Sequence, residues 1–383
     1  MTASEIIVRP VISRADKDAF LNLPAALFAD DPVWVPPLKM MVRDQLNPKK
    51  NPWFSHGEAQ LFLAERNGAV LGRISAQVDR SHLEHHNDAT GFFGFFDSVD
   101  EQPVADALFT AAGAWLKERR VSRVRGPFSL NINEESGLLV EGFESPPRVA
   151  MSHGKPFYQA LVEGAGFEKV RDLLAFLTPM DTALPYKHMK LLQRSIDRNP
   201  GLTFRHLDPK NYDDDIRILV DLFNQAWAEN WGFIPLTEAD AKHMASEFKL
   251  ILIPELVWFA FYEGKPAAMA VALPDLNEMI ADLGGSLWPK GWIKLAWRVL
   301  TRRSWSSGTR VPLMGVAPRF KNKPLGSVLA LTVMGAIRRE SLKLRLPVCE
   351  MSWVLEDNTQ TRHSLESIGG RVYKTYRVYE KAL

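Results

Sequence analysis

Residues 316–326 have the sequence Val-Ala-Pro-Arg-Phe-Lys-Asn-Lys-Pro-Leu-Gly, and they are the most informative part of this chain. The apolar residues 311–316 that lead into them predict a strand, and the periodic residues 327–344 that follow predict a helix. The basic loop between the two presents backbone N–H groups, a positive helix end and cationic side chains to one anion. A phosphate or pyrophosphate suits such a loop, although an ordinary solvated connection has the same composition.

The loop resembles that of the GNAT acyltransferase superfamily, whose members carry V-x-P-x-x-[QR]-x-x-G-x-[GA] after a splayed central strand. Val316, Pro318, Lys321 and Gly326 match this pattern in register. Pro324 stands where the family usually has its middle glycine, and it removes one N–H donor. Lys321 keeps the positive charge of the usual arginine but loses the bidentate geometry.

The predicted elements after the loop also follow the order of this family. Residues 348–355 predict a strand, and Asn358, a helix, Gly369-Gly370 and a strand over residues 372–379 come next. The resemblance implies that the loop holds the pyrophosphate of an acyl-coenzyme A. The residues expected to contact coenzyme A are Gly315, Val316, Lys321, Asn322, Lys323, Leu325, Gly326, Ser327 and Asn358.

The predicted elements of the first half repeat the order found after residue 200. Each half contains a hairpin, joined at Asn67-Gly68 and at Glu263-Gly264. We therefore expect an α/β protein with tandem GNAT-like domains, each a mixed twisted sheet flanked by helices. The expected boundaries are residues 1–180, a linker over 181–200, and residues 201–383.

Only the second of these domains is expected to bind acyl-CoA. In the first half, the strand at residues 92–96 runs into a turn with three acidic residues and no basic residue. Such a turn repels a pyrophosphate.

Composition indicates a soluble globular protein, with 46% hydrophobic and 24% charged residues among 383. Cys349 is the single cysteine, and the chain starts without a basic segment followed by an apolar run. We therefore expect a reducing, cytoplasmic location and no membrane-spanning segment. No His/Cys grouping has metal-ligand spacing, so no metal is expected.

Basic residues are concentrated between positions 285 and 345, where Glu340 is the only acid. The chain carries no nucleic-acid-binding motif, so we expect no nucleic-acid partner. Within this region, the insert at residues 284–308 places tryptophans and basic residues at helical spacing, which suits a membrane surface. Trp288, Trp292 and Trp297 are the expected membrane-contacting residues. A helix that covers the core, with basic side chains reaching solvent, is the alternative.

Acyl transfer from a thioester to an amine requires a polarised carbonyl, a base for the amine and an acid for the leaving thiolate. The resemblance assigns the first task to the N–H of Gly315 or Val316. Glu350 is the candidate base, because a carboxylate inside an apolar strand is costly unless it is paired or functional. An ion pair with a nearby arginine such as Arg345 is the alternative. Since Leu365 stands where the family usually has its tyrosine acid, Tyr373 and Tyr376 are the candidates for that role.

A cluster of aromatic residues is expected to contact the substrate chain, and packing between domains is its alternative. Its members are Trp227, Trp231, Phe233 and Trp353.

Taken with the insert and the tandem layout, these residues resemble the bacterial ceramide synthases. The resemblance implies a cytoplasmic acyl-CoA-dependent N-acyltransferase of sphingolipid metabolism, peripheral on the inner membrane, that acylates a long-chain sphingoid base. The alternatives are transfer to a polar amine (an amino acid, amino sugar or peptide) and a non-catalytic relic that binds acyl-CoA.

Overall fold

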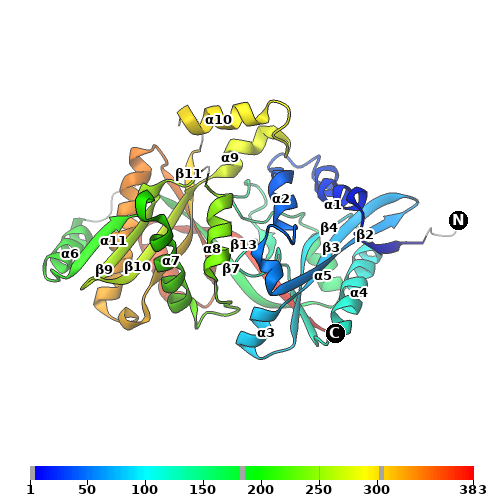
Figure 1. Ribbon diagram of the computed structural model, residues 1–383, viewed down its shortest axis with the longest axis horizontal. Coiled ribbons are helices and arrows are strands. Elements are labelled where there is room, and N and C mark those ends of the chain that lie inside the picture. Colours follow the sequence, from blue (N-terminus) through cyan, green and yellow to red (C-terminus); the bar gives the residue numbers. More distant parts are fainter. Residues whose placement is uncertain (1–4, 182–185, 250, 302–305) are drawn as a thin grey trace. The chain divides into compact units, whose positions relative to one another are not determined.

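A computed structural model of the chain describes residues 5–181, 186–249, 251–301 and 306–383 (Figure 1). The chain folds into two compact units. The first contains the residues up to Leu174 together with Ile280–Gly291 and Tyr373–Leu383, and the second contains Ala175–Met279 and Trp292–Val372. Arg302, Arg303 and Trp305 of the tryptophan-rich insert, and residues 182–185 of the expected linker, lie outside the described residues.

The first unit is built on a mixed sheet in which β4 and β5 are parallel and the other neighbours are antiparallel. Its strand order is β1-β2-β3-β4-β5-β13, and β6 pairs with β13. The strands are β1 (Ile7–Pro10), β2 (Gly57–Arg66), β3 (Ala69–Asp79), β4 (Thr90–Ser98), β5 (Arg123–Gly126), β6 (Leu138–Glu141) and β13 (Arg371–Ala382). Strand β7 (Glu168–Pro179) begins in this unit and ends in the second.

The helices of the first unit cover this sheet and bury an aromatic core. Phe93 and Phe96 of β4 pack against Phe109 of α4, with ring centroids 5.2 and 4.9 Å apart. Ser13 begins α1 with a capping box that it forms with Asp16. The helices are α1 (Arg14–Leu27), α2 (Lys39–Gln45), η1 (Pro52–Ser55), α3 (Arg80–His86), α4 (Gln102–Glu118) and α5 (Tyr158–Gly164).

The last strand of the chain, β13, completes the sheet of the first unit. Its residues from Tyr379 onward pair with β5, and the residues around Tyr376 pair with β6. Arg377 of β13 donates to both carboxylate oxygens of Asp172, at 2.8 and 3.0 Å. Lys374 is fully buried, and its Nζ donates to the carbonyls of Gly142 and Ser145 at 2.6 and 2.7 Å.

The second unit has the strand order β8-β9-β10-β11-β12, in which only β11 and β12 are parallel. The expected hairpins of both units are confirmed, since both turn residues have positive φ angles: 53° and 79° at Asn67-Gly68, and 50° and 75° at Glu263-Gly264. The strands are β8 (Leu202–His206), β9 (Val257–Tyr262), β10 (Lys265–Pro274), β11 (Gly308–Val316) and β12 (Val348–Leu355).

Helices cover both faces of this second sheet. Both α7 and α11 pack on β10, and residues 267–274 of that strand are buried at every position rather than at alternate ones. The helices are α6 (Tyr186–Asp197), η2 (Pro209–Asn211), α7 (Tyr212–Trp227), α8 (Glu238–Glu247), η3 (Pro254–Leu256), α9 (Leu276–Ile280), α10 (Gly291–Thr301), η5 (Pro318–Phe320), α11 (Pro324–Lys343) and α12 (Thr359–Ser367). The short helix η4 (Ala281–Leu283) belongs to the first unit.

Replacing Lys374 by methionine should destabilise the first unit by about 2–3 kcal/mol, because two partly buried carbonyls lose a charged donor that is itself fully buried. Urea denaturation measures this free energy of unfolding. The matched control is Lys117→Met on the exposed side of α4, which should change stability by less than about 0.5 kcal/mol. Equal effects of the two substitutions would contradict this role of Lys374.

Candidate functional site

The central feature of the second unit is an opening between β11 and β12. The two parallel strands pair only from Gly308–Val348 to Val311–Met351. Beyond these pairs β11 continues to Val316 and β12 continues to Leu355, while β11 keeps its pairing with β10. One edge of β11 therefore turns away from its parallel neighbour, as the resemblance to a splayed strand predicted.

The alternation of backbone groups along β11 identifies which donors face this opening. The N–H of Ala317 donates to Ala267, at the start of β10, at 2.8 Å. Since N–H groups of successive strand residues point to opposite sides, the N–H of Gly315 also points toward β10. The N–H groups of Met314 and Val316 point to the open side. Val316, rather than Gly315, is therefore the residue that can donate to an acyl carbonyl there.

Several N–H groups of the loop after β11 already donate hydrogen bonds to carbonyls of the same loop. Those of Phe320, Lys321 and Lys323 donate to the carbonyl three residues earlier, at 2.9–3.1 Å. Helix α11 begins at Pro324, which has no N–H, and the N–H of Gly326 donates back to Lys323 at 2.9 Å. In the first turn, Leu325 is the residue whose N–H the helix leaves for an outside acceptor.

Cationic side chains, rather than free backbone N–H groups, supply most of the positive charge around this loop. Arg319, Lys321, Asn322 and Lys323 are all exposed around the start of α11, where no side chain caps the helix. Lys321 pairs with Glu229, just beyond the end of α7, and Arg319 donates to the Pro266 carbonyl at 2.5 Å. An anion bound here would meet mostly side-chain charge and few backbone donors. Ser327 is exposed in the same turn.

Two glycines of the predicted site are required by close packing. A Cβ on Gly326 would collide with the carbonyl oxygen of Phe320, so glycine lets the loop close against the helix. A Cβ on Gly315 would lie 2.5 Å from the indole of Trp227 and 2.9 Å from Ala226. Both glycines are therefore required by the packing of the protein's own backbone and side chains.

Trp227 belongs to an apolar wall beside β11. Its indole stacks on Phe223, with ring centroids 4.9 Å apart, and Phe223 lies 5.8 Å from Phe233. The side chain of Asn224 bonds both backbone groups of Leu236 at 2.8 and 2.9 Å, which fixes the loop after α7. Trp227 and Phe233, both predicted to contact substrate, are thus joined through Phe223. Trp231 is half-buried in the same loop.

The predicted base Glu350 is fully buried and belongs to a charged network across β11 and β12. Ser352 donates to its Oε1 at 2.6 Å, and the Nε of Arg310 lies 3.5 Å from the same oxygen. Arg310 also donates to Ser352 at 2.9 Å and lies 4.8 Å from the ring centroid of Trp353. Its partner is therefore Arg310, opposite in the strand register, rather than the exposed Arg345 that the sequence suggested.

The remaining predicted residues lie in other places. Asn358 is exposed, and its side chain caps α12 by accepting from the N–H of Thr361 at 3.1 Å. Tyr373 is half-buried and Tyr376 is fully buried, and both belong to the first unit. Leu365 is buried in α12.

The first unit has the corresponding opening, but its own backbone fills it. Strands β4 and β5 pair only over residues 90–92 and 123–125. The N–H of Phe128 then donates to Phe93 at 2.8 Å, and Gln77 donates to the carbonyl of Phe128 at 2.6 Å. That carbonyl presses so closely on Gly94 that a Cβ there would overlap it. The space that stays open beside β11 is therefore closed beside β4.

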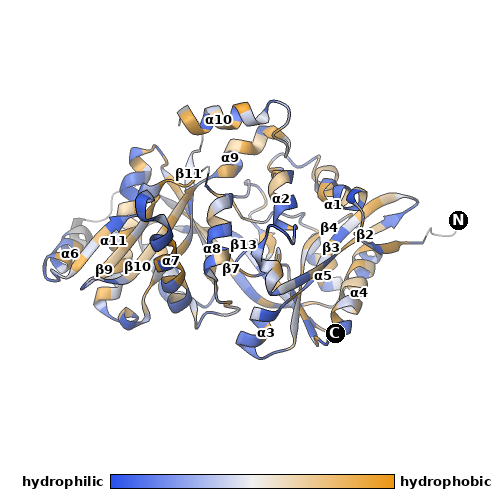
Figure 2. Cartoon of the chain, viewed as in Figure 1, coloured by the Kyte–Doolittle hydropathy of each residue, from blue (hydrophilic) through white to orange (hydrophobic). Residues whose placement is uncertain are grey.

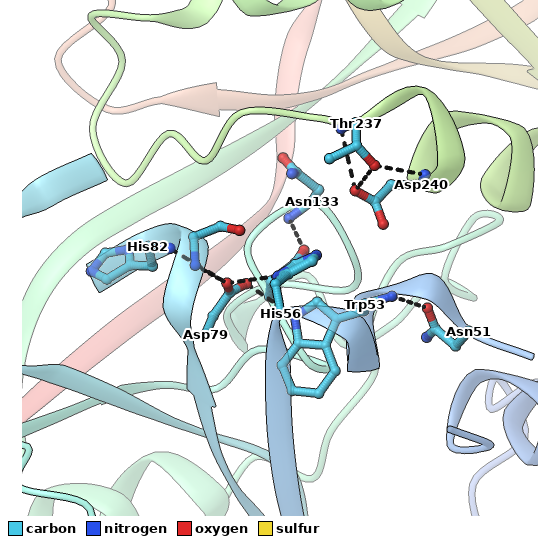
Figure 3. Close-up of polar contacts among 10 residues, drawn as sticks. Asn51, Trp53, His56, Asp79, His82, Asn133, Thr237 and Asp240 are labelled. Carbon is cyan, nitrogen blue, oxygen red and sulfur yellow. Dashed lines mark hydrogen bonds and ion pairs between the residues drawn. The ribbon is translucent and has the colours of Figure 1, made fainter. Parts of the chain in front are cut away.

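The first unit also holds a polar cluster that the sequence analysis did not single out (Figure 3). Asp79 is fully buried and accepts from Trp53 Nε1 at 3.0 Å and from the N–H of Ser81 at 2.9 Å. His56 Nδ1 lies 3.0 Å from the same carboxylate, which holds that nitrogen as the N–H donor. Burial lowers the pKa of the neighbouring His82 to about 4.

A carboxylate that orients an imidazole is an arrangement that general bases use. His56 and Asp79 are 23 residues apart, and only the pairing of β2 with β3 brings them together. The one local signal is that Asp79 directly precedes α3 and caps it.

Within the described parts of the chain, no group of three or more His, Cys, Asp or Glu side chains is arranged to hold a metal ion. Among the same residues, no helix has both the length and the apolar character needed to cross a bilayer.

Comparisons with known proteins identify full-length relatives. The chain is 40% identical to Protein YghO of Escherichia coli, over all of this chain and 97% of that protein. It is 42% identical to the bacterial ceramide synthase of Caulobacter vibrioides, over all of this chain and 99% of that enzyme. No family model matches the chain.

Solved structures share the fold at low sequence identity. A tandem GNAT protein from the clavulanic acid biosynthesis pathway matches with a TM-score of 0.55 at 11% identity, covering 99% of this chain and 98% of that one. A GCN5-related N-acetyltransferase from Sphaerobacter thermophilus matches with a TM-score of 0.51 at 14% identity, covering 98% and 95%. These likenesses confirm the expected tandem GNAT fold.

Replacing Gly326 by alanine should lower the free energy of unfolding by about 1–3 kcal/mol and displace the loop, because the new Cβ meets the Phe320 backbone. Gly335→Ala, in the same helix, is the control, since a Cβ there has open space. It should be neutral or stabilise by up to about 1 kcal/mol. Thermal denaturation of both variants checks this, and an undisturbed Gly326→Ala protein would refute the close fit.

Proposed function

We propose that this protein transfers an acyl group from acyl-CoA to the amine of a long-chain sphingoid base. The reason is that the chain belongs to the protein family that contains Protein YghO and a bacterial ceramide synthase. The amine nitrogen bonds to the thioester carbonyl carbon and loses a proton. The carbon–sulfur bond breaks, and coenzyme A leaves as a thiol. The product is an amide of the ceramide type.

The observation that carries this proposal is the opening between β11 and β12, directly before the basic loop. The N–H of Val316 faces this opening and is the proposed donor to the thioester oxygen. The N–H of Leu325 and the side chains of Lys321 and Lys323 are the proposed ligands of the pyrophosphate. Gly326 lets the loop close against the start of α11, which keeps the basic side chains of the loop at this helix end.

The coenzyme is proposed to bind the second unit alone. In the first unit, the backbone of Phe128 occupies the corresponding space. Asp97, near the end of β4, and Glu101, just before α4, each pair with an arginine of the same unit, so these two arginines are already engaged by carboxylates.

The aromatic wall supports a long-chain substrate. Trp227 lies against β11 at Gly315, and the buried Phe223 and Phe233 support it from behind. A hydrocarbon chain beside the thioester would therefore contact this indole rather than water. Each methylene buried there contributes about 0.8 kcal/mol, which favours a long chain over a polar amine. Because such substrates reside in bilayers, the proposed place of reaction is the cytoplasmic surface of the inner membrane.

Glu350 stays the proposed base. It is a fully buried carboxylate on the strand that forms one side of the opening, and Ser352 links it to Arg310. Arg310 lies opposite it in the strand register and is its ion-pair partner. That Tyr373 or Tyr376 protonates the leaving thiolate stays a prediction from the sequence, since both residues belong to the first unit.

With palmitoyl-CoA as donor, sphinganine should release free thiol with a kcat/KM at least about 100-fold higher than any amino acid, amino sugar or peptide, because its chain adds many buried methylenes. A thiol-reactive dye follows the release. Preference for a polar amine would assign the protein a different acceptor. Binding of palmitoyl-CoA without release to any acceptor would make it a non-catalytic acyl-CoA-binding protein.

Replacing Lys321 and Lys323 together by glutamate should weaken coenzyme A binding at least about tenfold, because two attractive charges become repulsive at the helix end. Binding to the unaltered protein should also weaken as salt rises. Calorimetry measures both effects. The matched control carries Lys210→Glu and Lys249→Glu, two exposed lysines elsewhere in the second unit. Unchanged affinity in the first variant would remove the loop from the site.

A further inference from the structure

Helix α10 of the second unit turns its large apolar side chains outward. The exposed fractions are 54% for Trp292, 52% for Ile293, 58% for Trp297 and 83% for Leu300. At 100° per residue these four positions fall within one arc of about 140° of the helix surface. Hydrophobic residues recur along this helix in Figure 2. Such a cluster is larger than the scattered apolar residues of an ordinary protein surface.

The opposite side of α10 holds the helix to its own unit. Leu295 is 4% exposed, and the guanidinium of Arg298 donates to the carbonyl of Met279 in α9. The cation therefore faces inward and the tryptophans face outward, the reverse of a helix that covers a soluble core. Rotation of α10 to bury Trp292 and Trp297 would break the bond of Arg298 and expose Leu295.

The charges around this face indicate what covers it. Residues 283–339 contain no aspartate or glutamate, and the exposed Lys290 and Lys294 lie just before and within the helix. Arg302 and Arg303 follow but lie outside the described residues. Tryptophan favours the boundary between hydrocarbon and headgroups, and lysines favour an anionic surface. An anionic lipid bilayer offers both at once.

We propose that α10 is the membrane-docking element of this protein and that it lies flat on an anionic bilayer, with Trp292, Ile293, Trp297 and Leu300 inserted among the lipids. Ile293 and Leu300 extend the set of membrane residues beyond the tryptophans that the sequence indicated. Trp288, which precedes the helix in the sequence and belongs to the first unit, is 81% exposed. This inference deepens the proposed function, since it gives a lipid amine a route to the enzyme.

Vesicle flotation with the full-length protein tests the docking element. The protein should float with vesicles that contain phosphatidylglycerol and should bind pure phosphatidylcholine more weakly. Replacing Trp292 and Trp297 by serine should reduce flotation at least about tenfold. The matched control replaces Ile12 and Leu331 by serine; these residues are 77% and 44% exposed elsewhere and should leave flotation unchanged.

Two results would overturn the proposal. One is equal flotation of the Trp292→Ser/Trp297→Ser variant and the unaltered protein. The other is absence of vesicle binding together with a concentration-dependent oligomer that the double variant abolishes, since the face would then join copies of the chain. Thiol release from palmitoyl-CoA with sphinganine dispersed in detergent, in the absence of vesicles, separates the two proposals. Failure of that reaction bears on the proposed function, whereas flotation bears only on α10.

Discussion

Two parallel strands that stop pairing halfway leave N–H groups of β11 pointing away from β10, its one remaining neighbour, and the second unit depends on this arrangement. Continued pairing with β10 keeps β11 extended beyond the point where it leaves β12. The donors of Met314 and Val316 therefore have fixed directions before any ligand binds. Such preorganised donors cost no reorganisation when charge develops on a carbonyl oxygen.

The two units use this arrangement in opposite ways, and a glycine shows the difference in each. Gly94 in β4 admits the carbonyl of Phe128, whose N–H bonds back to the same strand, so the first opening is closed by backbone. Gly315 in β11 admits the indole of Trp227 from the helix covering one face of the sheet. That contact is made on the face of the sheet, so it does not cover the edge of β11 toward β12. A repeated fold thus keeps one open edge and closes the other without changing its order of elements.

Local sequence predicts local structure well here. Asn67-Gly68 and Glu263-Gly264 fix both hairpins, because two successive residues with positive φ produce one kind of turn. The pairing of distant segments cannot be predicted from local sequence in the same way. Nothing local in β13 says that it joins β5, more than 240 residues earlier, since its alternation fits either sheet. The Arg310–Glu350 and His56–Asp79 pairs depend equally on strand register. Periodicity showed that α10 has an apolar face, but the inward bond of Arg298 decided which face packs.

One electrostatic property, a positive charge without nearby acids, is common to the whole basic region. What distinguishes residues 283–339 is the complete absence of acids as much as the number of bases. Pro324 and the internal turns of the loop leave few backbone donors at the start of α11, so attraction there must come from side-chain charge. Charge of this kind acts over about 10 Å and has little directional preference. A stretch without acids would therefore favour both the proposed anionic coenzyme at its loop and the proposed anionic surface at α10 by the same physical means. Directional groups such as the N–H of Val316 are needed only where a bond is made.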